Sequence, residues 1–447
     1  MRTNPIACRL HRRRAARDGR ARGSPAYFAA ERYPLIALRN RSSRSLRQAP
    51  REQHARSCRE CDFGRAAKPS SSVPRIVIAP DKFKGSLTAA QAAQAIERGI
   101  RRADPAAECV QCPMADGGEG TVEAFLERGA ERRTARVAGP LGAATDAVYA
   151  LRNGTAILEM AAASGLGLLA RSAYDPTRAD TSGTGQLISA ALDERATHLI
   201  IGIGGSATND AGTGMLRALG GRFLDRTGVP IEGPIFAFED LASIDCSELD
   251  ARPSNVRIEV AVDVDNPLCG PSGASYTFAE QKGAGADQIQ RLDAVLRHIA
   301  DVSAAALGRD YRDAKGAGAA GGLGFALAAF LGAKLEPGVQ LIARECGLDE
   351  LLSGAIWCIT GEGKIDAQTL HGKTVAGVAE IAAKHNVPTI AFCGVAEPDA
   401  VEALQARGVR VIAITPEGMP LADALKSGAQ LLESAAAAAP IMQTRPA

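Results

Sequence analysis

The chain has 447 residues, 46% of them hydrophobic, which is enough apolar material to predict two globular domains. Charged residues make up 23%, and no uncharged apolar run reaches the roughly 18 residues of a membrane span, so a membrane protein is excluded. The formal net charge of +2 hides an asymmetry: residues 1–74 hold 18 Lys and Arg against 5 Asp and Glu, whereas the remainder holds 34 against 45.

The basic head, residues 1–73, shows no apolar periodicity, and we expect it to be disordered and irrelevant to the chemistry. One interpretation is translated upstream DNA from a wrongly assigned start, with initiation near Val73. A nucleic-acid-binding arm and an Arg-rich, Ser-rich transit peptide are the alternatives. For the body we expect no nucleic-acid partner and no membrane partner. The oligomeric state is not predicted.

The ten cysteines do not form the pattern of a small disulfide-rich secreted domain, so a reducing cytoplasm is expected. Two C-x-x-C pairs, Cys58/Cys61 and Cys109/Cys112, could suggest a zinc site. The first pair lies in the basic head. The second lies in an expected strand, where residues three apart face opposite sides, so a metal site there is disfavoured.

From Arg75 onward, short apolar strands alternate with amphipathic helices. The first part predicts a strand over 75–80, a helix over 86–103 with Thr88 as N-cap, a second strand over 109–114 and a second helix over 117–129. A tighter rhythm follows, with strands 133–139, 147–151 and 155–160 as an antiparallel meander, helix 184–194, strand 198–205, a helix after Gly205, and strand 257–264. After a helix over 288–307, alternation returns with strand 355–360, helix 375–385, strands 388–394 and 410–415, and helix 422–437.

These elements predict an α/β fold with two domains. A parallel, flavodoxin-like sheet domain, residues 74–130 and 286–440, is interrupted by an inserted mixed-sheet domain, residues 131–285. Ligands of open α/β sheets bind at the carboxyl ends of the strands, so the active site is expected in the cleft between the domains.

Polar, glycine-rich segments occur at the expected strand ends. They are "DKFKGS" from Asp81, "ADGGEGT" from Ala115, "SGTGQ" from Ser182, "GIGGSATND" from Gly202, "VDVDNPLCGPSGAS" from Val262 and "GEGKIDAQTLHGKT" from Gly361. Glycines permit close backbone approach, and free amides at a helix N-terminus bind phosphate oxygens. Lys82 and Lys84 supply positive charge. Asp263 and Asp265, two residues apart in an expected strand, would share a face and could hold one Mg²⁺.

Two nucleotide-binding motifs compete with this interpretation. "GIGGSA" satisfies G-x-G-x-x-A, and Asp225 lies 23 residues after Gly202, as in a dinucleotide site. Asp210 would then lie close to a pyrophosphate, which disfavours that site. A Walker A loop is excluded, because Ala367 stands where the motif before "GKT" requires glycine.

The body resembles the bacterial glycerate kinase family, the type that phosphorylates glycerate at O2, over about residues 74–440. The motifs that carry the resemblance are "APDKFKGSLTA", "PMADGGEGT", "SGTGQLI", "IGIGGSATNDAGTG", "VDVDNPLCGPSGAS…QKGA", "GAGAAGGLG" and "ITGEGKIDAQTLHGKT". The resemblance implies two α/β domains, one inserted in the other, and a cytoplasmic enzyme that transfers phosphate from ATP with Mg²⁺ to (R)-glycerate, giving 2-phosphoglycerate. Ala211 stands where glycine is expected, a departure that alanine should tolerate if its φ is negative.

Phosphoryl transfer requires positioning and charge neutralisation. Asp210 is the first candidate for the group that orients the 2-hydroxyl or accepts its proton, with Asp116 and Asp366 as rivals; a helix N-cap role is the alternative for Asp116 and Asp210. Lys82 and Lys84 are the other expected catalytic residues, and Asp263 and Asp265 the metal ligands. The residues expected to bind substrate or nucleotide phosphates are Ser86, Asp116, Gly117, Gly118, Ser182, Gly183, Thr184, Gly204, Gly205, Ser206, Thr208, Asn209, Glu362, Lys364 and Asp366. A nicotinamide oxidoreductase and a sugar-acid binding protein remain alternatives.

Overall fold

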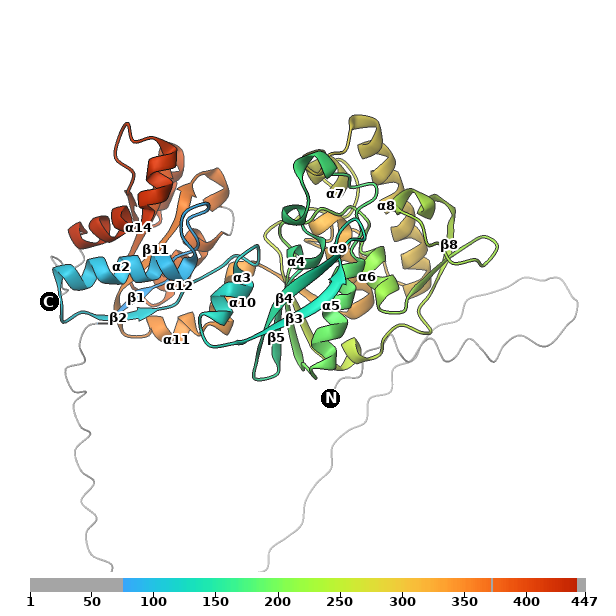
Figure 1. The fold of residues 1–447 in the computed structure, drawn as a ribbon, viewed down its shortest axis with the longest axis horizontal. Coiled ribbons are helices and arrows are strands. Elements are labelled where there is room, and N and C mark those ends of the chain that lie inside the picture. The colour runs from blue at the N-terminus through green and yellow to red at the C-terminus, as the bar shows by residue number, and fades with distance from the viewer. Residues whose placement is uncertain (1–74, 371–372, 440–447) are drawn as a thin grey trace, which may run out of the picture. The chain divides into compact units, whose positions relative to one another are not determined.

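The computed structural model describes residues 75–370 and 373–439 (Figure 1). The expected disorder of residues 1–73 and the pair Cys58/Cys61 lie outside this range. The strands are β1 (Arg75–Ile78), β2 (Glu108–Gln111), β3 (Glu131–Ala138), β4 (Ala144–Arg152), β5 (Thr155–Glu159), β6 (His198–Gly202), β7 (Arg222–Asp225), β8 (Leu241–Asp245), β9 (Arg257–Ala261), β10 (Lys334–Glu336), β11 (Ala355–Ile365), β12 (Thr389–Ala396) and β13 (Val409–Ala413).

The helices follow the predicted alternation at most positions. They are α2 (Ala89–Ala103), α3 (Thr121–Leu126), α4 (Ala161–Ser164), α5 (Ser182–Asp193), α6 (Thr213–Ala218), α7 (Ala274–Phe278), α8 (Ala286–Leu307), α9 (Ala319–Leu331), α10 (Gly338–Glu345), α11 (Leu348–Leu352), α12 (Thr374–Lys384), α13 (Pro398–Ala406) and α14 (Leu421–Ala438). None of the helices within the described ranges is long and apolar enough to cross a lipid bilayer.

A five-stranded parallel sheet is built from the two ends of the described chain. Its order is β13-β12-β11-β1-β2, and each neighbouring pair is parallel. Numbered by position along the chain, these strands run 2-1-3-4-5, which is the flavodoxin order. The predicted fold class is therefore confirmed, and the switch point of the sheet lies between β1 and β11.

A separate six-stranded sheet comes from the intervening chain, in the order β10-β9-β6-β5-β4-β3. Pairing is antiparallel from β3 to β5 and parallel from β5 to β10, so the predicted meander is present and the sheet is mixed. Strands β7 and β8 form a small antiparallel pair of their own.

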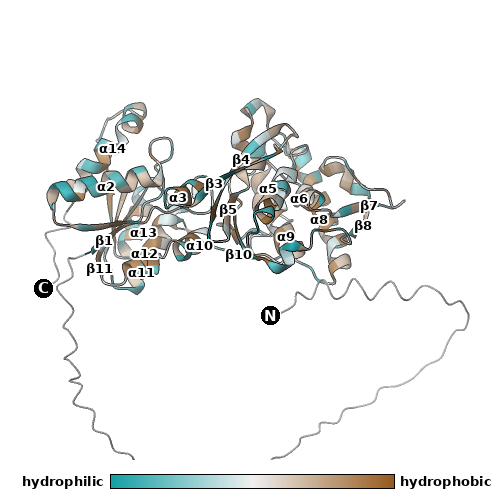
Figure 2. Ribbon diagram, turned by 60° about the horizontal axis from the view of Figure 1, so that its bottom comes forward, coloured by the Kyte–Doolittle hydropathy of each residue, from teal (hydrophilic) through white to brown (hydrophobic). Residues whose placement is uncertain are grey.

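Apolar side chains cover both faces of the parallel sheet. One face packs against α2 and α14, with Ile96 and Leu432 fully buried. The other face packs against α10 and α12 and continues to Ile157 and Ile200 of the six-stranded sheet. Figure 2 shows hydrophilic residues along α2 and hydrophobic residues along β5, as this layering requires.

The packing of the two cores indicates where the chain returns from the inserted domain to the parallel domain. Side chains of α8 and α9 belong to the core of the six-stranded sheet, and β10 is one of its strands. The division at residue 285 remains a prediction, and we propose to move the return to the parallel domain to about residue 337.

The start of α2 follows from its sequence. Thr88 accepts a hydrogen bond from the amide of Gln91, and the Gln91 side chain accepts one from the amide of Thr88, which completes a capping box. The predicted N-cap is thus confirmed. Cys109 of β2 packs with the α2 face, and Cys112, directly after β2, packs with the α10 face, so the two thiols lie on opposite sides of the sheet.

Gly99→Ala is expected to destabilise the protein, although alanine favours a helix over glycine by about 1 kcal/mol. A Cβ at Gly99 would lie 2.3 Å from the carbonyl oxygen of Glu433 and 2.7 Å from Cβ of Ala436, so α2 and α14 must separate. We expect the free energy of unfolding to fall by about 1–2 kcal/mol in urea titrations. Gln94→Ala on the exposed face of α2 is the control. Equal stability of the two variants would contradict close packing at Gly99.

Candidate active site

Carboxylates gather at the switch point of the parallel sheet. Asp81 follows β1, Asp116 follows β2, and Glu362 lies on β11, which extends beyond the predicted end of that strand. Asp263 follows β9 of the six-stranded sheet and accepts a hydrogen bond of 3.1 Å from the amide of Gly338. The carboxyl ends of strands at a switch point are where open α/β sheets bind ligands.

These carboxylates repel one another. Burial, and to a smaller extent the charge of Asp116, raise the pKa of Asp81 to about 6. The hydrogen bond that Thr374 Oγ1 donates to Asp81 Oδ2 at 2.5 Å opposes this rise. Burial, again followed by Asp116, raises the pKa of Asp263 to about 7. Burial also raises the pKa of Glu362 to about 7, against a 2.7 Å hydrogen bond from Thr369 Oγ1. The raised pKa values mean that negative charge is unfavourable on these carboxyls, so a cation bound among them would be favoured.

Lysines surround this group. Lys373 is the N-cap of α12, and its positive charge partly offsets the rise in the pKa of Asp263 and of Glu362. Its Nζ donates to Gln368 Oε1 at 2.8 Å. Lys82 Nζ donates to the backbone carbonyl of Glu119. Lys84 is exposed.

A cleft of about 340 Å³ adjoins the carboxylates. Its lining includes Asp81, Lys82 and Lys84, together with Thr88 at the start of α2. It also includes the acidic residues Glu119, Glu123 and Glu127. Lys82 and Lys84 therefore line the same cleft. Asp81 lies both in the lining of this cleft and at the switch point of the sheet.

The glycine-rich loop after β6, residues 203–212, lies directly against the loop after β2. A Cβ at Gly202 would lie 2.1 Å from the Gly117 carbonyl oxygen, and one at Gly204 would lie 3.0 Å from Gly118 Cα. Gly204 and Gly205 are exposed at the tip. The helix predicted after Gly205 is α6, which begins at Thr213, because Asp210 and Gly212 extend the loop. Any anion bound here would meet the loop amides.

The structure encloses Asp210, the residue predicted to act as base. It is 2% exposed, and its oxygens accept hydrogen bonds from Thr181 N, Thr181 Oγ1, Gly212 N and Gly214 N at 2.8–3.1 Å. Burial raises the pKa of its carboxyl. A buried carboxylate that already accepts four internal hydrogen bonds is not accessible to a substrate, so this geometry disfavours the predicted role.

Other predicted phosphate-binding residues make internal contacts instead. Ser86 Oγ donates to the Leu425 carbonyl at 2.7 Å, and Ser182 Oγ donates to Asp180 Oδ1 at 2.6 Å. Thr184 is 1% exposed and donates to Ser164 Oγ. A Cβ at Gly183 would lie 1.8 Å from the carbonyl oxygen of Ala138, so glycine is needed there for helix packing.

In the loop after β6, Ser206 and Thr208 accept hydrogen bonds from a buried lysine, Lys282. Asn209 Nδ2 donates to Ser275 Oγ at 3.0 Å. These three predicted phosphate ligands are all buried. They shape the loop and do not line its exposed tip.

The predicted metal pair is not brought together. Strand β9 ends at Ala261, so the alternation expected through Asp265 does not hold. Asp263 faces the switch point, whereas the Asp265 side chain is 80% exposed and lies 3.4 Å from Lys315. Lys364 is likewise exposed; it pairs with Glu397 at 2.7 Å and with Asp366 at 3.5 Å.

The dinucleotide alternative loses its acidic residue. Asp225 ends β7 in the small two-stranded sheet, and its carboxylate accepts hydrogen bonds from Thr227 and Val229 of its own turn. It is therefore committed to that turn and does not serve a ribose at the end of β6.

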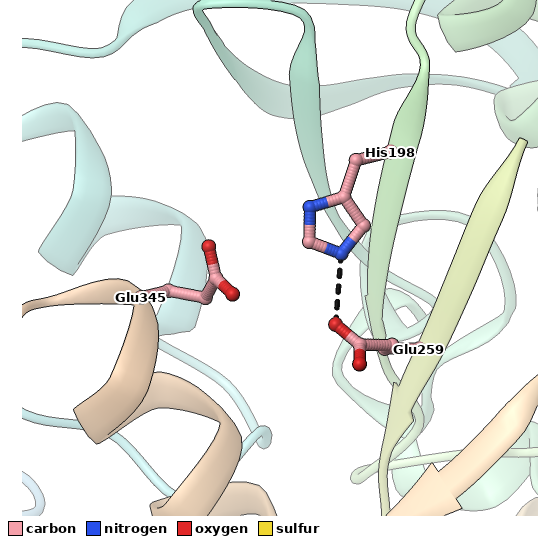
Figure 3. A group of neighbouring side chains, drawn as sticks. All are labelled: His198, Glu259 and Glu345. Carbon is pink, nitrogen blue, oxygen red and sulfur yellow. Dashed lines mark hydrogen bonds and ion pairs between the residues drawn. The ribbon is translucent and has the colours of Figure 1, made fainter. Parts of the chain in front are cut away.

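Within the described ranges, one group of His, Cys, Asp or Glu side chains has ligand atoms mutually within 4.8 Å: His198, Glu259 and Glu345 (Figure 3). His198 Nε2 lies 2.9 Å from Glu259 Oε2. Glu259 also accepts hydrogen bonds from Arg257 and Arg344, at 2.6 and 2.9 Å. Because both oxygens of Glu259 are already paired with cations, the group is an ion-pair network.

Asp81 and Lys373 belong to the candidate site, although the sequence assigned neither of them a role. Asp81 is the first carboxylate after the first strand, and Lys373 belongs to the "GKT" that lacks the glycine of a phosphate loop. The position of Asp81 at the end of a central strand was the available signal.

Parallel strands in flavodoxin order, with carboxylates and lysines at the switch point, are typical of α/β proteins that bind a small molecule. The sequence profile of the glycerate kinase family matches residues 76–444. A glycerate kinase of Bacillus subtilis (strain 168) is 47% identical over 365 residues, covering 81% of this chain and 96% of the relative. A glycerate 2-kinase of Escherichia coli (strain K12) is 48% identical over 324 residues, covering 72% and 85%.

A crystal structure of a provisionally assigned glycerate kinase 2 from Salmonella typhimurium LT2 superposes with a TM-score of 0.74 at 45% identity, covering 82% of this chain and 96% of that one. The chain belongs to the glycerate kinase family. The predicted family and the predicted enzyme class, a kinase, are confirmed.

Proposed function

We propose that this protein is an ATP-dependent kinase that phosphorylates (R)-glycerate at O2, giving 2-phosphoglycerate. The observation that carries the proposal is the group of Asp81, Asp116, Asp263 and Glu362 at the switch point, next to Lys82 and Lys373. Transfer of a phosphoryl group between two anionic molecules requires charge neutralisation and positioning, and this group can provide both.

The donor set fits Mg²⁺, which the kinase family implies. Mg²⁺ prefers carboxylate oxygens and is often held by only one or two of them. Asp263 and Asp81 are the carboxylates whose raised pKa values a cation would relieve most directly. When bound, Mg²⁺ would neutralise charge on the phosphates of the nucleotide.

The chain's own residues would divide the remaining tasks. Lys82, Lys84 and Lys373 would bind phosphate oxygens or the glycerate carboxylate as point charges. The exposed backbone at Gly204 and Gly205 would supply amide donors. Asp116, near both Asp81 and Asp263, would orient the 2-hydroxyl of glycerate and accept its proton.

The reaction is tested with the purified full chain, (R)-glycerate, ATP and Mg²⁺. ADP is measured in one assay, and in a second assay enolase converts 2-phosphoglycerate to phosphoenolpyruvate, which is read by its ultraviolet absorbance. We expect both signals without phosphoglycerate mutase. A signal that requires mutase would place the phosphate on O3. A folded protein that forms no ADP, or that oxidises a nicotinamide cofactor instead, would contradict the proposal.

Removal of divalent ions is expected to abolish activity. With excess chelator, ADP formation should fall by at least about 100-fold, because unshielded phosphates and carboxylates would repel one another. Excess Mg²⁺ should restore it, and a monovalent salt at equal ionic strength serves as the control. Full activity in chelator would show that Asp81 and Asp263 do not act through a cation.

The cysteines of the described ranges are free, which is typical of a reducing compartment, so we also propose a cytoplasmic location. Small molecules are the proposed partners.

A further inference from the structure

Lys282 is a buried amine outside the proposed catalytic group. It ends the short 3₁₀ segment Glu280–Lys282 and is 2% exposed. Its Nζ donates to Ser206 Oγ at 2.8 Å and to the Thr208 carbonyl at 2.7 Å. Burial lowers its pKa to about 7, although the charge of Asp210 opposes the shift. Burying a lysine is costly, so what its hydrogen bonds hold in place is informative.

Both acceptors lie in the loop over 203–212. Its backbone is held largely by other segments: Leu166 N donates to the Gly205 carbonyl, Ala207 N to the Ser164 carbonyl, and Ala211 N to the Gly321 carbonyl, each at 2.9 Å. Ala211 has a φ of 53°, so the negative φ expected for it is wrong, and the value is strained for a residue with a Cβ. The loop therefore depends on outside contacts for its shape, and Lys282 supplies two of them.

The loop also contains an unpaired polar atom. Asn209 Oδ1 is buried and has no hydrogen-bond partner within the described structure. Without the Lys282 ammonium, Ser206 Oγ and the Thr208 carbonyl would each lose a donor as well. Unsatisfied buried acceptors are expensive, so the loop would rearrange to reach water or new donors.

A rearrangement would reach the active site through a direct contact. The start of the loop lies against Gly117 and Gly118 so closely that Gly202 and Gly204 leave no room for a side chain. Asp116 precedes these glycines, and its Oδ1 accepts a 3.0 Å hydrogen bond from Gly118 N. Movement of the loop thus moves the segment that sets the orientation of Asp116.

We propose that Lys282 is a positioning residue, which holds Ser206 and Thr208 so that the loop after β6 keeps Asp116 in place for phosphoryl transfer. This role rests on the proposed function. It assigns no contact between Lys282 and substrate.

Lys282→Met, which keeps the side-chain length and removes the donors, is expected to lower kcat per folded molecule by about tenfold or more. KM should rise for the substrate whose anionic group meets Gly204 and Gly205, because their amides belong to the same loop, and should change less than about threefold for the other substrate. Lys384→Met, at the exposed end of α12, is the matched control. Unchanged kcat in a Lys282→Met protein that has only become less stable would reduce Lys282 to a structural role and overturn the proposal.

Ser206→Ala is the second variant, since it removes one acceptor and leaves the lysine. It should lower kcat less than Lys282→Met does, and the double variant should lose no more than Lys282→Met alone. Multiplying losses would show that the two residues act separately, against the proposal.

Hydrogen exchange of the substrate-free protein provides a readout that does not depend on the reaction. Lys282→Met should speed exchange of the amides in 203–212 and in 116–120, while 389–396 of β12 should be unchanged. If the wild-type protein makes no ADP, the proposed function fails, but hydrogen exchange still tests whether Lys282 connects the loop over 203–212 to residues 116–120. Faster exchange confined to 203–212 would overturn the proposal for Lys282.

Discussion

Asp263→Asn is expected to lower kcat by about 10²–10³-fold without loss of the fold. The carboxylate lies at the switch point, where it would hold a cation or balance the lysines, and the neutral amide can do neither. The amide oxygen can still accept the hydrogen bond from Gly338 N, so local packing should survive. Steady-state kinetics at saturating Mg²⁺, compared with circular dichroism of the same preparation, measure both outcomes.

The same substitution should stabilise the metal-free protein. The pKa of Asp263 is raised from 3.8 to about 7 in the folded state, so between these values the folded state binds more protons than the unfolded one. The free energy of unfolding of wild type therefore loses a contribution as pH rises from about 4 to about 7. Asp263→Asn does not lose it. In chelator, its melting temperature should exceed that of wild type by an amount that grows over this window, reaching about 2 °C or more, and then stays constant.

Asp265→Asn is the matched control, two residues away with an exposed side chain. It should change kcat less than about threefold and show no such pH-dependent gain, because surface ion pairs contribute little. Equal effects at the two positions would restore the metal pair expected from the sequence. A less stable Asp263→Asn protein at every pH would contradict the mutual repulsion of the carboxylates.

Local patterns in the sequence were sufficient for the strands of the parallel sheet and for α2, α3, α12 and α14, but not for α10, α11 and α13. Thr88 could be placed as an N-cap because capping involves residues three positions apart. A parallel, flavodoxin-like sheet was predicted because apolar runs alternated with helices, and the structure supplies the order of its strands. Glu362 and Asp116 were predicted as site residues because they follow expected strands of that sheet, and the structure places both at the switch point.

The remaining errors come from contacts between distant segments. The sequence does not reveal that β9 stops at Ala261, and the two-residue spacing of Asp263 and Asp265 therefore misled the metal prediction. Helices α8 and α9 match the pattern of either domain, and only packing assigns them to the six-stranded sheet. Whether a carboxylate in a glycine-rich loop points outward or is enclosed likewise depends on neighbours such as Thr181, which lies 29 residues from Asp210.

The enclosed carboxylate of Asp210 holds two helix starts together. Its Oδ2 accepts hydrogen bonds from Thr181 N, Thr181 Oγ1 and Gly214 N, and its Oδ1 accepts one from Gly212 N. An asparagine has one carbonyl oxygen, so either orientation points its NH₂ group at amide donors. The carboxylate thus ties the start of α5 to the start of α6, a structural task that a neutral isostere cannot perform.

Asp210→Asn is therefore expected to lower the free energy of unfolding by about 2–4 kcal/mol while lowering kcat per folded molecule less than about tenfold. Urea titration and kinetics well below the melting temperature separate the two effects. Asp225→Asn is the control, because its carboxylate also accepts backbone amides, but within an exposed turn, so the loss there should be smaller. If Asp210→Asn instead keeps its stability and loses 100-fold or more in kcat, Asp210 is the base, and the loop after β6 must open to admit glycerate during the catalytic cycle.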